Sequence, residues 1–520
     1  MEDTLLKKHV IRIFIFCLIS TVFLYSQSGE PESTSKDASL NQNLSKTEHT
    51  FSLNGETISY TATAGKLPLR DKSEKSKAHI FFIAYTKNNV KDKSSRPVTF
   101  AFNGGPGSSS VWLHMGALGP KKVLLDEEGL NPAYPFKLID NPYSILDITD
   151  LVFIDPVSTG FSRAESGENP KQFHGYEEDI ESVGEFIRLY ITQFGRWSSP
   201  KFILGESYGT IRASGLAGFL QGRSLGMHID GVILVSAVLN SLVKDFSTGN
   251  DLPYIFFFPS YTAAAWYHKK LPEELLNRKL EDVLAESEKF ALGDYALALL
   301  KGNRLSEEEK SEIIQNVAKY TGLSPDYVEQ SNLRIELFRF LKELLREDHL
   351  TIGRLDSRFT GMDEDAAGER FEYDPSSTAP TGAFSNLFNH YVRTELNYPD
   401  TSAYNISGQV WPWNFGNENS RTRFSNSAEI LRQVMSQNPY LKIFIANGYY
   451  DFATPYFATE YAVSHLGLNS EFKDRIFMKY YESGHMMYIR EASHQKLKQD
   501  LVEFYHQATS FIPEAIDRIG

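Results

Sequence analysis

The chain has 520 residues, of which 41% are hydrophobic, 13% aromatic and 23% charged, and its formal net charge at pH 7 is −13. This composition is that of an ordinary globular protein and excludes a disordered chain, which would be poorer in apolar and aromatic residues. The 66 acidic and 53 basic side chains, without a long Lys/Arg stripe, argue against nucleic acid as a partner, because binding phosphates requires basic surface. The single cysteine, Cys17, excludes an intramolecular disulfide framework and any metal site built from several cysteines.

The N-terminal residues have the pattern of a secretory signal peptide. Lys7, Lys8 and Arg12 precede an almost wholly apolar run over residues 13–25, and small or polar residues follow it. The run is shorter than the roughly 20 residues that a membrane-spanning helix needs, so an uncleaved membrane anchor is the weaker alternative. We therefore expect a signal peptide over residues 1–27, a secreted or periplasmic protein, and no stable membrane association after cleavage.

The elements expected next along the chain alternate between strands and helices. Residues 28–47 are rich in Ser, Glu, Lys, Asn and Gln, and we expect a disordered linker there. An Asn-Gly pair at residues 54–55, between strand-like runs, is a hairpin signal. Further strands are expected over 80–86, 98–102, 151–154, 202–204, 231–236, 442–446 and 476–480, and helices over 177–194, 208–221, 456–465 and 491–507. This alternation predicts a mostly parallel sheet covered by helices on both faces.

The stretch from about residue 242 to residue 413 breaks the alternation and is largely helical. Within it, Ser306 followed three residues later by Glu309 is a capping box, which marks the start of a helix. We interpret residues 242–413 as a helical insertion, which divides one α/β core into a first part over 48–241 and a second part over 414–520.

Residues 205–209, Gly-Glu-Ser-Tyr-Gly, match the pattern G-x-S-x-G, with a predicted strand before them and a predicted helix after them. A sharp strand-to-helix turn would hold Ser207 in a strained conformation with its hydroxyl exposed, beside the positive dipole end of the helix. The pattern also fits a glycine-containing turn with a helix-capping serine. The flanking strand and helix, together with candidate partners further along the chain, favour a nucleophile.

A serine nucleophile needs a base, usually a histidine, which a carboxylate holds in place. For this motif, the partners follow in the chain order Asp or Glu, then His. Asp451 and His485 each lie just past the carboxyl end of a predicted strand, where α/β sheets build their sites. His465 and His494 fall within predicted helices and Asp474 precedes its strand, so these three are weaker candidates.

Residues 103–110, Asn-Gly-Gly-Pro-Gly-Ser-Ser-Ser, follow the predicted strand over 98–102. A Gly-rich loop at this place can present backbone N–H groups to a developing oxyanion, and we expect those of Gly105 and Tyr208 to form the oxyanion hole. A phosphate-binding loop is the alternative, but neither G-x-x-x-x-G-K-[ST] nor G-x-G-x-x-G is present. We expect no cofactor and no metal ion.

Taken together, these residues resemble the serine carboxypeptidases, the carboxypeptidase Y-like branch of the α/β-hydrolases. The matching blocks are residues 103–110, 205–209, 447–455 and 484–485, with a further similar block at 156–162. The resemblance covers roughly residues 50–240 and 425–510. It implies an α/β-hydrolase fold with a mostly parallel central sheet flanked by helices, and a helical cap in the insertion. Because eukaryotic members are rich in disulfides, the chain resembles a disulfide-free, bacterial-type member.

The resemblance also implies an activity: the release of amino acids, one at a time, from the C-termini of peptides that carry a free carboxylate. In such an enzyme Ser207 attacks the last peptide bond and forms an acyl-enzyme. His485 takes the proton of the serine and passes it to the leaving amine, and Asp451 orients His485.

Members of this family bind the free carboxylate of the substrate with the Asn of the Gly-rich loop and the Glu before the nucleophile. These residues are Asn103, with Gly104 beside it, and Glu206 here. A glutamate next to a substrate carboxylate is repulsive unless the two share a proton, and burial raises a carboxyl pKa in that direction. The resemblance therefore implies a preference for acidic pH.

The sequence departs from the family at three positions. A second Glu typically precedes Leu-Gly-Pro downstream of the Gly-rich loop, whereas Ala117 stands here, which leaves the acid optimum open. Many relatives carry Cys in the Gly-rich loop where this chain has Ser108. An aromatic residue is common two positions before the loop Asn, where this chain has Ala101, so the first substrate pocket would be shaped differently.

Two other functions fit the same residues. An esterase or acyltransferase could use the same nucleophile, base and carboxylate, because another nucleophile can intercept an acyl-enzyme. A non-catalytic binding protein is opposed by the complete set of Ser207, Asp451 and His485. The side-chain preference at the cleaved bond and the oligomeric state are not indicated by the sequence.

Overall fold

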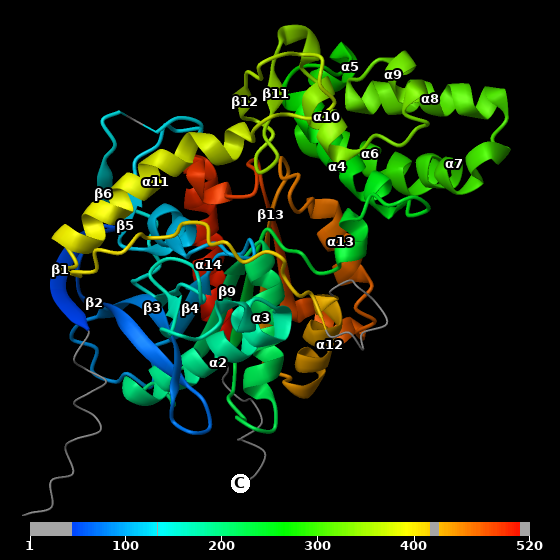
Figure 1. Ribbon diagram of the computed structural model, residues 1–520. Coiled ribbons are helices and arrows are strands. Elements are labelled where there is room, and N and C mark those ends of the chain that lie inside the picture. Colours follow the sequence, from blue (N-terminus) through cyan, green and yellow to red (C-terminus); the bar gives the residue numbers. More distant parts are fainter. Residues whose placement is uncertain (1–43, 133, 417–425, 510–520) are drawn as a thin grey trace, which may run out of the picture. The chain divides into compact units, whose positions relative to one another are not determined.

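The structure is a computed structural model, and it describes residues 44–132, 134–416 and 426–509 (Figure 1). The predicted signal peptide and most of the predicted linker lie outside these residues. The linker was predicted to run to residue 47, but β1 (Ser45–Leu53) already pairs with β2 (Glu56–Arg70) at Ser45. The sequence pattern did not reveal the start of this strand, because it lies at the edge of the sheet and its first six residues are all polar and alternate between half-buried and exposed positions.

Ten strands form one sheet within the described residues, in the order β1-β2-β3-β7-β4-β9-β10-β13-β14, with β8 paired to β3. The further strands are β3 (Ser76–Lys87), β4 (Val98–Phe102), β7 (Asp150–Ile154), β8 (Arg163–Ala164), β9 (Lys201–Glu206), β10 (Gly231–Val235), β13 (Lys442–Gly448) and β14 (Ile476–Tyr481). The strands from β7 to β14 are parallel, and those before them in this order are antiparallel. The predicted hairpin is present, with left-handed backbone at Asn54 and Gly55.

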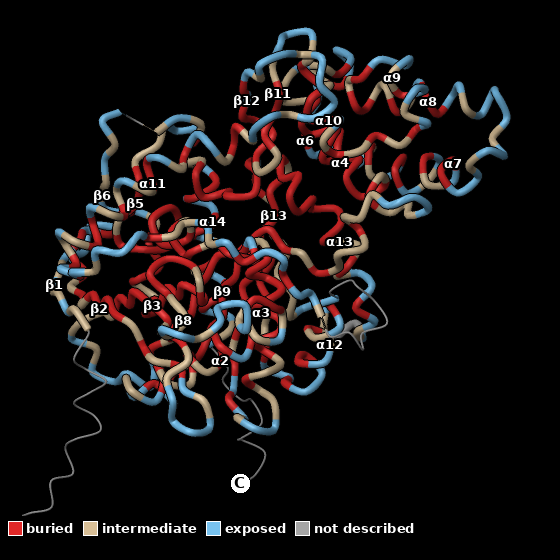
Figure 2. Tube along the Cα trace, viewed as in Figure 1, coloured by how far each residue is buried: buried red, intermediate tan, exposed pale blue. Residues whose placement is uncertain are grey.

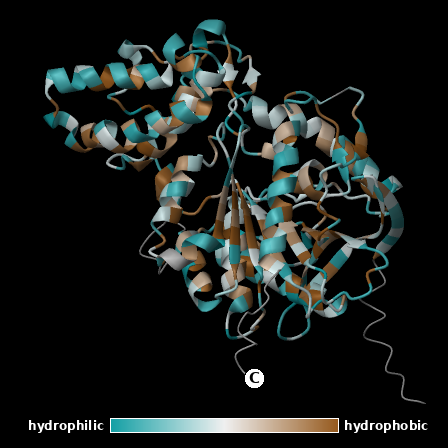
Figure 3. Cartoon of the chain, turned by 180° about the vertical axis from the view of Figure 1, so that it is seen from behind, coloured by the Kyte–Doolittle hydropathy of each residue, from teal (hydrophilic) through white to brown (hydrophobic). Residues whose placement is uncertain are grey.

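Helices cover both faces of this sheet, which confirms the predicted α/β class. On one face, α2 (Tyr176–Gln193), α3 (Tyr208–Gln221) and α12 (Ser427–Gln437) share a hydrophobic cluster with alternate strand residues such as Phe100 and Phe102. On the other face, α14 (Glu491–Thr509) packs with the intervening residues, of which Ala101 is one. The central strands β4, β7, β9 and β10 are buried along their length (Figure 2) and strongly hydrophobic (Figure 3), as strands covered on both faces must be.

The residues predicted as a helical insertion lie between β10 and α12. Their elements are η3 (Ser241–Lys244), α4 (Leu252–Tyr267), α5 (Glu273–Leu276), α6 (Leu280–Phe290), η4 (Ala291–Tyr295), α7 (Ala296–Lys301), η5 (Gly302–Arg304), α8 (Glu307–Thr321), α9 (Pro325–Gln330), α10 (Leu337–Glu343), η6 (Arg346–Asp348), β11 (Thr351–Ile352), β12 (Thr360–Gly361) and α11 (Pro375–Thr394). The capping box of Ser306 and Glu309 is present at the start of α8.

Most of the insertion predicted over residues 242–413 is divided between two hydrophobic clusters. Its part up to Ile352 forms a cluster of its own, which also includes Phe452 and Tyr456 from the chain after β13. Its later part packs on the sheet instead, since Phe384 and Phe388 of α11 belong to the same cluster as α14. The sequence pattern reveals which face of a helix is apolar but not which cluster receives it, so this division was not predictable.

Short elements complete the fold: η1 (Leu113–Leu118), β5 (Lys121–Val123), β6 (Leu138–Asp140), η2 (Pro170–Phe173), α13 (Tyr456–Ser464), η7 (Ser470–Arg475) and η8 (Met487–Ile489). Among the described residues, no helix combines the length and the apolar character that crossing a membrane requires. The carboxyl ends of β4, β9, β13 and β14 lead into the loops that carry every residue expected at the site.

Candidate active site

Ser207 lies at the sharp turn between β9 and α3. Its backbone has φ 60° and ψ −128°, a strained conformation that residues with a side chain rarely adopt. The turn is possible because Gly205 and Gly209 flank it: a Cβ on Gly205 would lie 2.0 Å from the carbonyl oxygen of Gly209. The N–H of Ser207 donates to the carbonyl of Val235 at 3.0 Å, which ties the turn to β10. The hydroxyl is thus presented on a rigid support.

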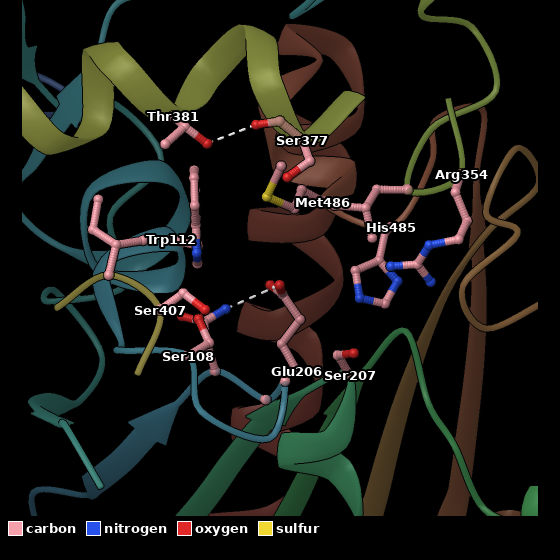
Figure 4. A pocket seen from close by; sticks show the side chains of 15 residues that line it. Ser108, Trp112, Glu206, Ser207, Arg354, Ser377, Thr381, Ser407, His485 and Met486 are labelled. Atoms are coloured by element: carbon pink, nitrogen blue, oxygen red, sulfur yellow. Dashed lines mark hydrogen bonds between the residues drawn. The ribbon is translucent and has the colours of Figure 1, made fainter. Parts of the chain in front are cut away.

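Asp451 follows β13 and is fully buried, and His485 follows β14. The carboxylate of Asp451 accepts a hydrogen bond of 2.7 Å from Nδ1 of His485. The same carboxylate accepts from the backbone N–H groups of Ala453 and Thr454, at 2.7 and 2.9 Å, and from the Thr454 hydroxyl at 2.5 Å. Because a carboxylate can only accept, Nδ1 of His485 carries a proton, and Nε2 is the nitrogen left to face the cavity. Figure 4 shows His485 directly beside Ser207.

The insertion holds the loop that carries His485. The carbonyl of Leu355 accepts from the backbone N–H of His485 at 2.6 Å, and the carboxylate of Asp356 accepts from the N–H of Gly484 at 3.0 Å. Arg358 pairs with Asp356 at 2.6 Å and balances its buried charge. On the core side, the hydroxyl of Ser236 donates to the carbonyl of His485 at 2.6 Å. The sequence offered no signal for Leu355 or Asp356, because these contacts join segments more than 100 residues apart.

Asn103 and Glu206 form a buried pair at the end of β4 and β9. The amide Nδ2 of Asn103 donates to Oε1 of Glu206 at 2.9 Å, and Oδ1 of Asn103 accepts from the N–H of Leu113 at 3.1 Å, which fixes the orientation of the amide. The hydroxyl of Tyr488 donates to Oε2 of Glu206 at 2.7 Å, a contact that no sequence motif indicated. Burial raises the pKa of Glu206 from its ordinary value near 4.5 to about 7, although His485, Tyr488 and Asn103 all lower it.

The Gly-rich loop rests directly on the serine turn. A Cβ on Gly104 would lie 2.4 Å from the backbone nitrogen of Tyr208, so only glycine allows this approach. Gly105 has φ 103°, in the region that favours glycine. Tyr208 is the first residue of α3, and its N–H therefore has no carbonyl partner within the helix. The two N–H groups predicted for the oxyanion hole thus belong to adjoining segments next to Ser207.

One cavity of about 490 Å³ contains most of the predicted site residues (Figure 4). Its lining consists of Asn103, Gly104, Gly105, Ser108, Trp112, Glu206, Ser207, Arg354, Leu355, Ser377, Thr381, Ile406, Ser407, His485 and Met486. Asp451 lies behind His485 and outside this lining. The weaker candidates His465, His494 and Asp474 do not line the cavity, and neither do Ala101 and Ala117.

The sequence did not predict the far wall of the cavity. Ser377 and Thr381 come from α11, Arg354 from the loop between β11 and β12, and Trp112 from the chain before η1. Within the described residues, no group of three or more His, Cys, Asp or Glu side chains is placed to hold a metal ion. The cavity therefore offers a serine hydroxyl, an imidazole and a buried carboxyl–amide pair as its reactive groups.

Comparison with known proteins defines the class. Residues 56–502 match the sequence model of the serine carboxypeptidases. The chain belongs to the serine carboxypeptidase family.

The sequence identity to individual relatives is low or is confined to part of the chain. The pheromone-processing carboxypeptidase KEX1 of Saccharomyces cerevisiae is 34% identical over 179 residues, which are 32% of this chain and only 23% of that protein's length. The lysosomal protective protein of Mus musculus is 24% identical over 447 residues, 81% of this chain and 82% of that protein. The crystal structure of KEX1 superposes with a TM-score of 0.52 at 17% identity, over 85% of this chain and 92% of that one. The fold is therefore that of the α/β-hydrolases, as expected.

Proposed function

We propose that this protein is a serine carboxypeptidase, which releases C-terminal amino acids from peptides through an acyl-enzyme on Ser207. The observation that carries the proposal is the shared cavity: Ser207 and His485 line it together with the Asn103–Glu206 pair. The first two residues supply acyl-transfer chemistry. The pair supplies a place for a free carboxylate within reach of the same hydroxyl.

In the proposed reaction, Ser207 Oγ attacks the carbonyl carbon of the last peptide bond while His485 Nε2 accepts the hydroxyl proton. The N–H groups of Gly105 and Tyr208 donate to the oxyanion of the tetrahedral intermediate. His485 then protonates the leaving amine, and the C–N bond breaks. Water, activated by His485, hydrolyses the acyl-enzyme. Asp451 keeps the proton on Nδ1 and stabilises the imidazolium that forms.

Recognition of the substrate's end depends on the protonation of Glu206 in this proposal. With a pKa of about 7, Glu206 is largely protonated in mildly acidic solution and donates a hydrogen bond to the substrate carboxylate. Above that pH the ionised carboxylate repels the substrate. The need for a free carboxylate would make the enzyme an exopeptidase, because an internal peptide bond offers none.

The test compares N-blocked dipeptides that have a free C-terminus with the same dipeptides amidated there. We expect cleavage of the free acids and little or no cleavage of the amides. Equal rates on both sets would refute the carboxypeptidase and favour a general acyl hydrolase. The Ser207→Ala variant should lose turnover while its circular dichroism spectrum stays that of the wild type, and full residual activity would refute the nucleophile.

The proposal extends to the location of the protein. The signal-like pattern of residues 1–27 supports an exported, secreted or periplasmic enzyme, and a single cysteine within that segment supports a disulfide-free, bacterial-type member. Expression of the full chain in a bacterium, followed by cell fractionation and mass measurement of the product, tests this. A product that keeps residues 1–27 and stays in the cytoplasm would refute export.

A further inference from the structure

Arg354 brings a positive charge into the cavity from the loop between β11 and β12. The backbone of this residue is fixed on both sides. Its N–H donates to Oδ1 of Asp374 at 3.1 Å, and its carbonyl accepts from the N–H of Phe452 at 3.1 Å, next to Asp451. The side chain is about one-third exposed, at 34%. Figure 4 shows its guanidinium extending beside His485.

The charge of Arg354 has little compensation from the protein. The nearest carboxylate oxygen, Oδ2 of Asp374, lies 3.9 Å from Nε of Arg354, beyond hydrogen-bond distance. The other oxygen of Asp374 already accepts from the backbone and the hydroxyl of Ser376, at the start of α11. Within the described part of the chain, the guanidinium donates no hydrogen bond. It therefore presents its N–H donors, which match the geometry of a carboxylate, to whatever enters the cavity.

A second cation lies close by. Lys244, at the end of η3, is half-buried beside Thr454, which bonds to Asp451. Burial and, to a smaller extent, the neighbouring Arg354 guanidinium lower the pKa of Lys244 to about 8, although Asp451 raises it. At neutral or mildly acidic pH this amine is protonated, so a second positive charge lies near that of Arg354. Such a pair is stabilised when an anion joins it.

The position of Arg354 relative to Glu206 determines which part of a peptide it meets. In Figure 4 the two side chains lie on opposite sides of Ser207 and His485. If the terminal carboxylate binds at Asn103 and Glu206, the C-terminal residue occupies the space between that pair and Ser207. The acyl part then continues past Ser207 toward Arg354. This step rests on the proposed function.

We propose that Arg354, with the charge of Lys244 beside it, selects peptides whose penultimate residue is Asp or Glu. The side chain of that residue would meet the guanidinium in a charge-assisted, bidentate hydrogen bond as the bond next to it reaches Ser207. A penultimate Lys or Arg would be repelled. The C-terminal residue lies near neutral side chains, Trp112, Thr381 and Met486, so no charge preference arises there.

The experiment uses the purified protein and three N-blocked dipeptides with C-terminal Ala and with Glu, Gln or Lys as the penultimate residue. Gln is the matched neutral control, because it has the shape of Glu without the charge. At pH 6, where the Glu side chain is ionised, we expect kcat/KM for Glu to exceed that for Gln by about tenfold, as one charge-assisted hydrogen bond supplies. The Lys peptide should be the poorest.

Variants of Arg354 test whether this residue causes the preference for a penultimate Glu. In Arg354→Gln the ratio of kcat/KM between the Glu and Gln peptides should fall to about one, and in Arg354→Glu the Lys peptide should become better than the Glu peptide. Arg354→Lys should keep a reduced preference. The matched control is Arg188→Gln on α2, whose guanidinium pairs with Glu185 away from the cavity, and it should keep the wild-type ratio.

Equal kcat/KM for the Glu and Gln peptides in the wild type would overturn the inference while leaving the carboxypeptidase intact. So would a wild-type ratio that persists in Arg354→Gln, or an acidic preference confined to the C-terminal residue in a second peptide series. Hydrolysis of none of the free peptides would overturn the proposed function and this inference with it. If Arg354→Gln does not fold, the wild-type enzyme still tests the inference. Its preference for the Glu peptide over the Gln peptide should be lost in high salt, and a preference that persists there would overturn the inference.

Discussion

The hydroxyl of Tyr488 donates a hydrogen bond of 2.7 Å to the same carboxyl group, that of Glu206, which Asn103 holds through its other oxygen. The ring of Tyr488 packs against Gly116, which leaves room for it: a Cβ on Gly116 would lie 2.7 Å from Cε2 of the ring. Ala117, where relatives typically have a second Glu, is buried and does not line the cavity. In this chain the partner of Glu206 is therefore a neutral phenol rather than a second carboxyl group.

This arrangement predicts the effect of Tyr488→Phe on pH dependence. The phenol stabilises the ionised form of Glu206 and lowers its pKa, so removing the hydroxyl raises that pKa further. If protonated Glu206 is the form that binds substrate, the alkaline limb of the kcat/KM profile moves to higher pH, by up to about one unit for one lost hydrogen bond. The profile is measured on an N-blocked dipeptide.

The matched control for that variant is Tyr481→Phe. The hydroxyl of Tyr481 donates to Asp500 at 2.8 Å, and neither residue lines the cavity. This change should leave the alkaline limb in place. An alkaline limb that moves to lower pH in Tyr488→Phe would contradict the role assigned to the phenol.

Glu206 also predicts a pH dependence of stability. Its pKa is raised on folding from near 4.5 to about 7, so the native state binds more protons than the unfolded state between these values, and this group makes stability fall as pH rises. Replacement by the neutral isostere in Glu206→Gln removes that penalty. Relative to the wild type, the variant should gain up to about 3 kcal/mol between pH 4.5 and pH 8. Urea unfolding at the two pH values measures the difference, and a constant difference would refute it.

The proximity of Ser207, Asp451 and His485 could be predicted because each follows a strand in a short local pattern, and parallel strands bring their carboxyl ends to one edge. Their catalytic roles stay predictions until variants are measured. The contacts of Tyr488 and Asp356 could not be predicted, since each depends on packing between segments far apart in the chain and carries no periodicity. These unpredicted contacts tune the site rather than create it.

Asp451→Asn tests the orientation of His485. The amide cannot accept at both of its terminal atoms, so it no longer favours a proton on Nδ1, although Ala453 and Thr454 still hold the loop. We expect kcat to fall on the order of 10³–10⁴-fold with little change in fold, as in enzymes where this carboxylate fixes the tautomer. Asp500→Asn on α14 is the control and should keep activity. A loss of less than about tenfold would remove Asp451 from the proposed mechanism.

Gly484→Ala tests whether the insertion positions His485. A Cβ at this residue would lie 2.4 Å from the Cβ of Asp356, so the loop or the insertion must shift. Overpacking of this kind destabilises by about 1–3 kcal/mol, and a displacement of about 1 Å at the base can reduce kcat about 10²-fold. We expect kcat to fall far more than KM changes.

The control for this change is Gly382→Ala on α11, where an added Cβ meets nothing within 4 Å and alanine favours the helix. That variant should keep the wild-type kcat and be as stable or slightly more stable. Activity is followed on an N-blocked dipeptide and stability by thermal unfolding. Asp356 belongs to the insertion, and Gly484 belongs to the core loop that carries His485. An unimpaired kcat in Gly484→Ala would therefore mean that the core loop alone holds His485 and that the insertion has no part in aligning the base.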